Sequence, residues 1–160
     1  MILILMGVTG SGKTTVGKKL AEVLACPFID ADDYHSQANK EKMSQGVALT
    51  DEDREPWLAD LSVVVKLLGI KSPLSVLACS ALKRKYRDLL SASTKVRWIY
   101  LKGGRELLNQ RLEGRLNHFA NPKLLESQLE SLEEPEDALV IDIKEDLGKI
   151  VGRIVQEVKG

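Results

Sequence analysis

The octapeptide Gly7-Val8-Thr9-Gly10-Ser11-Gly12-Lys13-Thr14 constrains the fold of this chain more than any other feature, because it matches the pattern G-x-x-x-x-G-K-[ST] without a mismatch. The apolar run Ile2–Met6 precedes it directly, and the amphipathic stretch Lys13–Leu24 follows directly. A strand, this loop and a helix in succession form a phosphate-binding unit. The alternative, a glycine-rich turn with a chance lysine, would not require these flanking elements.

The residue types of the loop predict how it binds a nucleotide. Glycines allow backbone dihedral angles and close approach that a Cβ atom would prevent, and the backbone N–H groups of the loop and first helical turn converge on phosphates. Lys13 is expected to reach the β- and γ-phosphates, and the Thr14 hydroxyl to bind Mg²⁺. The predicted ATP-binding residues are Gly7, Thr9, Gly10, Ser11, Gly12, Lys13, Thr14 and Thr15.

Short apolar runs alternate with amphipathic stretches along the rest of the chain, which is typical of parallel α/β architecture with helices on both faces of the sheet. No linker or repeat interrupts this pattern, so residues 1–160 are expected to form one domain. The predicted strands are Ile2–Met6, Pro27–Asp30, Leu74–Cys79, Val96–Leu101 and Ala138–Ile141. The predicted helices are Lys13–Leu24, Pro56–Leu68, Leu82–Leu90, Arg105–Glu113, Lys123–Leu132 and Glu145–Lys159.

Composition excludes several classes of function. The chain has 23 Lys plus Arg and 23 Asp plus Glu, and this balance argues against a nucleic-acid partner. No apolar run approaches the roughly 18–20 residues of a membrane span, so no membrane association is expected. The two cysteines, Cys26 and Cys79, form neither a disulfide framework nor a zinc pattern, which fits a cytoplasmic location.

Two long polar segments interrupt the alternation: Ala31 to Glu55, with a short helix expected near Ala38–Ser44, and Gly114 to Asn121. Loops of this length in a compact domain are usually functional or disordered. Each follows an α/β unit, so both could overhang the carboxyl edge of the sheet, where ligands bind in such folds.

Other features favour a small-molecule kinase among phosphate-loop proteins. The chain lacks the Asn-Lys-x-Asp element of guanine-specific GTPases, and its third strand ends in Ser80 rather than in the acid expected of a motor or transporter ATPase. Acids cluster instead after the second strand, at Asp30, Asp32 and Asp33. A carboxylate at that position can reach either the metal or an acceptor hydroxyl.

Several segments resemble the gluconate kinase family. They are Phe28-Ile29-Asp30-Ala31-Asp32-Asp33-Tyr34-His35, the stretch from Gly46 to Leu58, Cys79-Ser80-Ala81-Leu82-Lys83-Arg84-Lys85-Tyr86-Arg87, and His118-Phe119 with the helix that follows. The resemblance implies a three-layer α/β/α P-loop kinase fold with a five-stranded parallel sheet in the order 2-3-1-4-5 and a mobile lid at about residues 111–121. It also implies ATP- and Mg²⁺-dependent phosphorylation of D-gluconate at the C6 hydroxyl. A homodimer is a possible assembly, since gluconate kinases are often dimers.

The acids after the second strand are assigned separate roles. We expect Asp32 to orient the acceptor hydroxyl and receive its proton, although it could instead only cap a turn. Asp30, together with Thr14, is the predicted Mg²⁺ site, and a plain hydrogen-bonding role for Asp30 is equally compatible with the sequence.

An anionic acceptor needs a cation, and a guanidinium group binds a carboxylate through two parallel hydrogen bonds. We expect Arg54 to be a substrate ligand, with pairing to Asp51 or Asp53 as the alternative. Lys83 and Arg87 are also expected to contact the substrate, because they share a helical face and follow the third-strand motif.

The lid region supplies further candidates. Arg111 and Arg115 lie four residues apart on one side of a helix, so we expect them to stabilise charge on the transferred phosphoryl group. For Arg115 the alternative is a surface ion pair. His118 matches the lid motif and is expected to touch gluconate, as is Gln128 from the next helix.

Two other functions remain open at this stage. A shikimate kinase shares the phosphate loop and the strand-two carboxylates, but typically carries three glycines after the third strand, where this chain has Ser80-Ala81-Leu82. The presence of Lys13, Thr14, Asp32 and Arg111 together argues against a non-catalytic ATP-binding regulator.

Overall fold

The computed structural model of the chain describes residues 1–114 and 122–160. Five parallel strands form a single sheet in the order β2-β3-β1-β4-β5, which confirms the expected topology. The strands are β1 (Ile2–Met6), β2 (Phe28–Asp30), β3 (Ser75–Ala78), β4 (Val96–Lys102) and β5 (Leu139–Asp142). The phosphate-loop strand β1 is central and pairs with β3 and β4, so its carboxyl end opens at the middle of the sheet edge.

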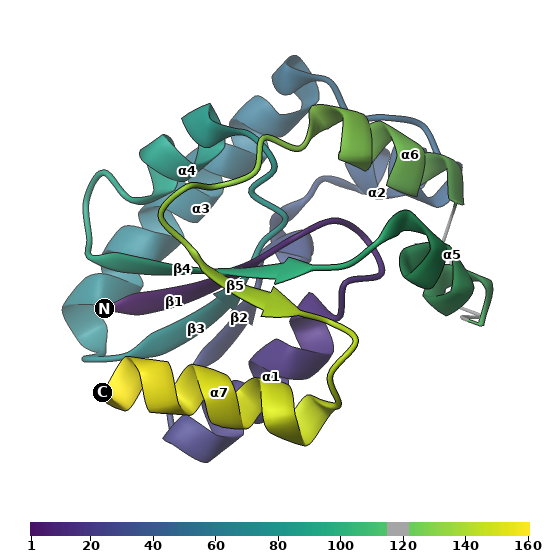
Figure 1. The fold of residues 1–160 in the computed structure, drawn as a ribbon. Helices are drawn as coiled ribbons and strands as arrows, with labels where there is room; N and C mark the ends of the chain where they lie inside the picture. Colours follow the sequence, from purple (N-terminus) through teal and green to yellow (C-terminus); the bar gives the residue numbers. More distant parts are fainter. Residues whose placement is uncertain (115–121) are drawn as a thin grey trace.

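Helices cover both faces of the sheet, as Figure 1 shows. One face packs on α1 (Lys13–Leu24) and α7 (Leu147–Lys159), and the other on α3 (Asp51–Lys71) and α4 (Arg84–Leu90). Successive side chains of β1 alternate between the two cores: Leu3 and Leu5 face α1 and α7, while Ile2 and Ile4 face α3 and α4. Both faces are thus buried, which explains the continuous apolar sequence of the strand.

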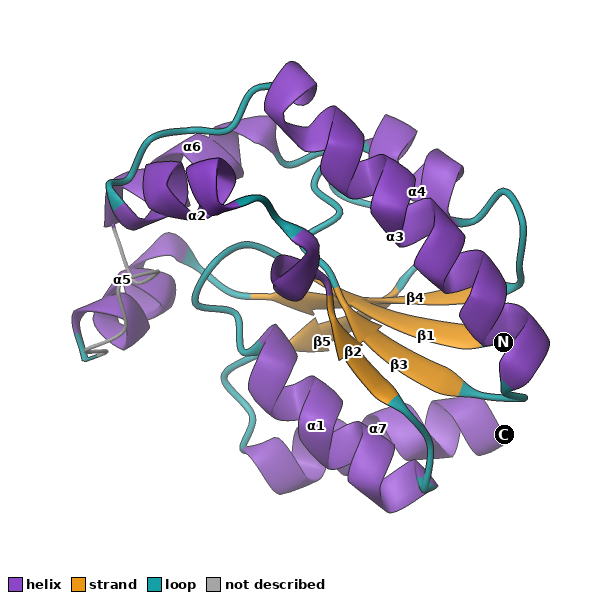
Figure 2. Cartoon of the chain, turned by 180° about the vertical axis from the view of Figure 1, so that it is seen from behind, coloured by secondary structure: helices purple, strands orange, loops and turns teal. Residues whose placement is uncertain are grey.

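The remaining helices lie beyond the carboxyl ends of the strands, where α2, α5 and α6 are labelled on the right of Figure 1. They are the 3₁₀ helix η1 (Ala31–Tyr34), α2 (Gln37–Ser44), α5 (Arg105–Glu113) and α6 (Pro122–Ser131). Figure 2 shows the same arrangement from behind, with α2 and α6 on one side of the sheet edge and α1 on the other. Within the described ranges, none of the helices combines the length and apolar character that crossing a membrane requires.

The segment Ala31 to Glu55 is more regular than its polar sequence indicated. The expected short helix is present as α2, but α3 begins at Asp51 rather than at Pro56. A capping box starts it: the Thr50 side chain accepts from the N–H of Asp53, and the Asp53 carboxylate accepts from the N–H of Thr50. These two bonds fix the first turn, and Pro56 is tolerated in the second turn. As a result, Arg54 lies on a helix instead of in a loop.

Candidate active site

The phosphate loop has the backbone geometry that its glycines predict. Gly7, Gly10 and Gly12 all have positive φ angles, of 151°, 85° and 92°. A Cβ atom on Gly7 would lie only 2.8 Å from both the Leu101 carbonyl oxygen and Ser11 Oγ. Helix α1 begins with no side-chain cap and no acid in its first turn. No capping side chain therefore accepts hydrogen bonds from its first N–H groups, which point toward the phosphate loop. This cradle fits the phosphates of a nucleotide.

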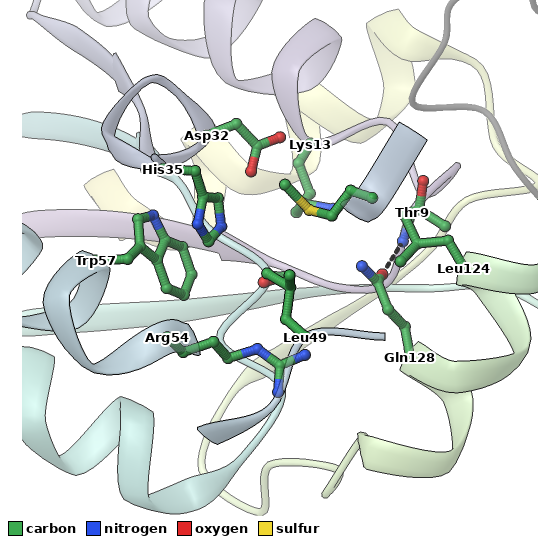
Figure 3. Close-up of a pocket in the computed structure, with 11 residues that line it drawn as sticks. Thr9, Lys13, Asp32, His35, Leu49, Arg54, Trp57, Leu124 and Gln128 are labelled. Atoms are coloured by element: carbon green, nitrogen blue, oxygen red, sulfur yellow. Dashed lines mark hydrogen bonds between the residues drawn. The ribbon is translucent and has the colours of Figure 1, made fainter. Parts of the chain in front are cut away.

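A cavity at the carboxyl edge of the sheet gathers predicted site residues from four separate parts of the sequence. Its polar lining comes from Thr9, Lys13, Asp32, His35, Arg54, Ser80 and Gln128. In Figure 3, Asp32 and Lys13 lie on one side of it and Arg54 on the other. Lys13 Nζ donates to the Val8 carbonyl at 3.1 Å, so the lysine folds over the loop that it belongs to.

The two predicted metal-binding residues touch each other. Thr14 Oγ1 donates to Asp30 Oδ2 at 2.8 Å, and Asp30 Oδ1 accepts from the N–H of Asp32 at 3.0 Å. Among the described residues no group of three or more His, Cys, Asp or Glu side chains could hold a metal ion by itself. A hydroxyl and a carboxylate beside a phosphate cradle are the sparse oxygen donors that suit Mg²⁺, which keeps waters and binds phosphates.

Asp32 faces Lys13 at the mouth of the cavity. Its side chain is exposed to solvent there, yet enough protein surrounds the carboxyl group that loss of hydration raises its pKa. The positive charge of Lys13 opposes this rise, while the nearby carboxylates of Asp30 and Asp33 add to it. A carboxylate with a raised pKa is a better proton acceptor than an ordinary surface aspartate.

Arg54 lies on the other side of the cavity and is only 7% exposed. Its Nη1 donates to the Tyr86 hydroxyl at 3.1 Å, and its Cζ lies 5.5 Å from the centre of the Tyr86 ring. The structure does not pair it with Asp51 or Asp53: Asp53 binds Lys42, and Asp51 binds Lys83 and Lys85. Within the described part of the chain, Arg54 has no carboxylate partner. Such a buried cation is suited to bind an anion.

His35, 8% exposed, also lines the cavity. Its ring stacks on Trp57 with the centroids 4.1 Å apart, and Trp57 Nε1 donates to the Ala31 carbonyl at 2.7 Å. Asn39 Nδ2 donates to the Asp53 carbonyl at 2.8 Å and lies 3.3 Å from His35 Nδ1. Because an amide nitrogen only donates, Nδ1 must accept, and the ring hydrogen sits on Nε2. Burial, then the charges of Arg54 and Lys40, lowers the pKa of His35 to about 4.

Two predicted substrate ligands lie elsewhere. Lys83 occupies the N-cap position of α4 without a capping side-chain hydrogen bond, and its Nζ donates to Asp51 Oδ1 at 3.1 Å. Arg87 is buried and donates to three backbone carbonyls, those of Ala81, Leu82 and Glu133, so it joins the turn after β3 to the segment after α6. Lys83 and Arg87 do not share the predicted helical face, because Lys83 precedes α4 in an extended conformation and its side chain turns toward Asp51 at the start of α3.

Gln128 and Arg111 are both in contact with the phosphate-loop region. The N–H of Thr9 donates to Gln128 Oε1 at 2.7 Å, drawn as a dashed line in Figure 3. Arg111 lines a second hollow together with Ser11, Gly12 and Thr15, and its Nη2 donates to the Ile143 carbonyl at 2.6 Å. This hollow shares no lining residue with the cavity of Arg54 and is a candidate place for the rest of a nucleotide.

Arg115 and His118, and most of the expected lid at about 111–121, lie outside the described residues. Cys79 is buried, and burial raises its pKa to about 12, which argues against a role as a nucleophile. Tyr86 was not predicted as a site residue. Its signals in the sequence are its place inside the basic cluster after the third strand and inside the segment there that resembles gluconate kinases.

Comparisons with known proteins agree with this geometry. The family model of shikimate kinase matches residues 9–158. A probable gluconokinase of Xenopus tropicalis is 43% identical over 99% of this chain and 93% of its own length, and the thermosensitive gluconokinase of Escherichia coli is 43% identical over 97% and 86%. The crystal structure of a gluconokinase from Sinorhizobium meliloti superposes with a TM-score of 0.84 at 36% identity, covering 98% of this chain and 94% of that one.

The match to the shikimate kinase model reflects the kinase fold that these proteins share, whereas the relatives near 40% identity are gluconokinases over nearly their full lengths. Lys13 of the phosphate loop, Asp32 and the buried Arg54 line one cavity, and with these relatives the chain belongs to the gluconokinase family.

Proposed function

We propose that this protein transfers the γ-phosphoryl group of ATP to the C6 hydroxyl of D-gluconate, giving 6-phospho-D-gluconate. Arg54 is the observation that carries the choice of acceptor. It is a buried guanidinium without a carboxylate partner in the described residues, and it lies across one cavity from Lys13 and Asp32. An acceptor with a carboxylate at one end and a hydroxyl at the other can satisfy Arg54 and Asp32 at the same time. The gluconokinase relatives support this assignment.

The phosphate loop and the start of α1 hold the triphosphate through backbone N–H groups, and Lys13 supplies a positive charge to the group being transferred. Thr14 and Asp30 are the proposed ligands of Mg²⁺, directly or through water. When bound, Mg²⁺ neutralises charge on the phosphate oxygens. Because Thr14 and Asp30 already touch at 2.8 Å, the protein presents both oxygens on the same side of the loop.

Asp32 is the proposed proton acceptor. It orients the acceptor hydroxyl toward the γ-phosphorus and takes its proton as the new P–O bond forms. Since phosphoryl transfer passes through a loose transition state, the position of Asp32 matters more than its basicity. The positive charge of Lys13 opposes the rise in the pKa of Asp32 and so favours the ionised form that can accept a proton.

Arg111 is proposed to stabilise negative charge on the phosphates from the other side of the loop, and Arg115 to do the same from the lid. His118 and Gln128 are proposed to contact gluconate. Lys83 and Arg87 are left out of this set, since their side chains are bound to Asp51 and to backbone carbonyls.

An acceptor screen tests the proposal. ADP release is measured in a coupled assay with gluconate, shikimate, sorbitol and nucleosides, and the product is identified by the coupling between ³¹P and the C6 protons. We expect kcat/KM for gluconate to exceed that for shikimate or sorbitol by at least about 100-fold. A preference for shikimate would reassign the acceptor. ATP binding without turnover on any acceptor would instead favour a binding-only protein.

A further inference from the structure

Among the residues that the structure describes, Arg54 is held in the cavity by one hydrogen-bonding side chain, that of Tyr86. The Tyr86 hydroxyl accepts from Arg54 Nη1 at 3.1 Å, and the Arg54 Cζ atom lies over the Tyr86 ring. Tyr86 is 3% exposed, and its ring belongs to the core under α3 and α4. A guanidinium group carries five N–H donors, so one bond to Tyr86 leaves the others available to a ligand.

The direction of the Tyr86 hydrogen bonds follows from the chemistry of its partners. Arg54 can only donate, so the phenol oxygen accepts from it. The phenol hydrogen therefore goes to its other partner, Asp51 Oδ1, which can accept it. Burial, followed by the hydrogen bond to Asp51, raises the pKa of Tyr86, so the hydroxyl stays protonated and this direction is kept.

Asp51 is itself fixed by two further donors. Lys83 Nζ lies 3.1 Å from Oδ1 and Lys85 Nζ 2.7 Å from Oδ2. Hydrogen bonds from Lys85, Tyr86 and Lys83 hold the pKa of Asp51 well below its usual range. The negative charge of Asp51 is thus paired with two lysines, and a neutral phenol separates it from Arg54. A carboxylate directly on Arg54 would orient it equally well, but would compete with an anionic substrate.

We propose that Tyr86 is a positioning residue that aims the Arg54 guanidinium at the carboxylate of the acceptor, and that Asp51 fixes Tyr86 for this purpose. The inference rests on the proposed function, because it takes the ligand of Arg54 to be a carboxylate. An arginine fixed before the substrate arrives loses less side-chain freedom on binding, so the contribution appears in substrate affinity. The positioned Arg54 binds the carboxylate before as well as during phosphoryl transfer. Loss of this positioning should therefore change KM more than kcat.

The first test is Tyr86→Phe, which keeps the ring under Arg54 and removes the hydroxyl. We expect KM for gluconate to rise about 5- to 20-fold, with kcat within about twofold and KM for ATP unchanged. Tyr100→Phe is the matched control. That tyrosine is also buried in the same core, but its hydroxyl binds Glu134, away from the cavity. Tyr100→Phe should leave KM for gluconate unchanged.

A double-mutant cycle separates positioning from general packing. In an Arg54→Ala background, Tyr86→Phe should have no further effect on KM for gluconate, because Tyr86 acts only through Arg54. Asp51→Ala should raise KM for gluconate in the wild-type background and not in the Arg54→Ala background. Asp51→Ala therefore tests the same inference if Tyr86→Phe does not fold.

The outcomes distinguish this inference from the proposed function. If the wild-type protein does not phosphorylate gluconate, the proposed function fails. If it does, and Tyr86→Phe leaves KM for gluconate unchanged or raises it equally with and without Arg54, the positioning role of Tyr86 is wrong while the function stands.

Discussion

The backbone N–H of Thr9 donates a hydrogen bond to Gln128 Oε1 at 2.7 Å, so the phosphate loop is joined to α6 across 119 residues of sequence. The oxygen of the Gln128 amide is thereby occupied. The amide nitrogen of Gln128 is left to face the cavity, which Arg54 and Asp32 also line. Gln128 can therefore hold the loop and contact the acceptor at the same time.

Gln128→Glu should weaken acceptor binding more than Gln128→Ala does. Glutamate keeps the acceptor for Thr9 but loses the amide donor and adds a negative charge to a site for anions. We expect KM for gluconate to rise more than about tenfold in Gln128→Glu and less in Gln128→Ala, by steady-state kinetics. Gln156→Glu, on the exposed side of α7, makes the same change of charge away from the site and should have no effect. Equal kinetics for all three variants would exclude Gln128 from the acceptor site.

Lys13→Ala should abolish most of the turnover without unfolding the protein. Lys13 is the charge that the phosphate loop brings to the transferred phosphoryl group, so its loss acts on kcat. We expect less than about a tenth of wild-type kcat, with a melting temperature close to that of the wild type. Lys19→Ala is the control on the same helix, since its exposed pair with Glu22 contributes little. Retention of more than a tenth of kcat would show that Lys13 does not have this role.

Asp32→Asn keeps the shape of the side chain but removes its charge and its ability to take a proton. We predict a fall in kcat of at least about 100-fold, while the Kd for ATP, measured by calorimetry, changes less than about threefold. Asp30→Asn should behave differently, raising the Mg²⁺ concentration needed for half-maximal rate, because it loses a metal ligand. Comparable losses of ATP affinity and turnover in Asp32→Asn would move Asp32 into the metal site.

Arg54→Ala removes the charge opposite Asp32. A hydrogen bond to a charged group contributes about 1.5–3 kcal/mol, so KM for gluconate should rise roughly 10- to 150-fold. Arg54→Lys should recover only part of this, since an ammonium group lacks the two-pronged geometry. Sorbitol, which has no carboxylate, should be a poor acceptor for the wild type and lose little more in Arg54→Ala. Wild-type activity on sorbitol equal to that on gluconate would contradict the assignment of Arg54.

His35 makes stability depend on pH in a defined window. Its pKa is about 4 in the folded protein and near 6.5 when unfolded, so below pH 6.5 the unfolded chain takes up a proton that the folded protein does not. The contribution of His35 to the free energy of unfolding is therefore complete above pH 6.5. It is lost as the pH falls toward 4, by up to about 3 kcal/mol. His35→Phe keeps the stacking on Trp57 and removes the titration. Its free energy of unfolding, measured with denaturant, should fall less steeply between pH 6.5 and 4 than that of the wild type. Parallel curves would show that His35 titrates normally.

The local sequence determined the phosphate loop and the sequence of strands and helices. Gly7 and Gly12 need backbone angles that other residues rarely adopt, and the run Ile2–Met6 is apolar on both sides because both sides are buried. Such properties depend on neighbouring residues, so they can be read in order along the chain. Strand order required the resemblance to a family, because periodicity does not say which strands pair.

Tertiary structure decided which cations face the acceptor cavity. The sequence predicted substrate contacts for Arg54, Lys83 and Arg87, yet Lys83 binds Asp51, 32 residues away, and Arg87 binds the carbonyl of Glu133, 46 residues away. Only Arg54 of the three lines the cavity, because the capping box of Thr50 and Asp53 extends α3 back to Asp51 and so places Arg54 inside its first turns. A charged side chain pairs with a partner that lies near it in space. The fold alone decides which remote segments of the chain lie that close.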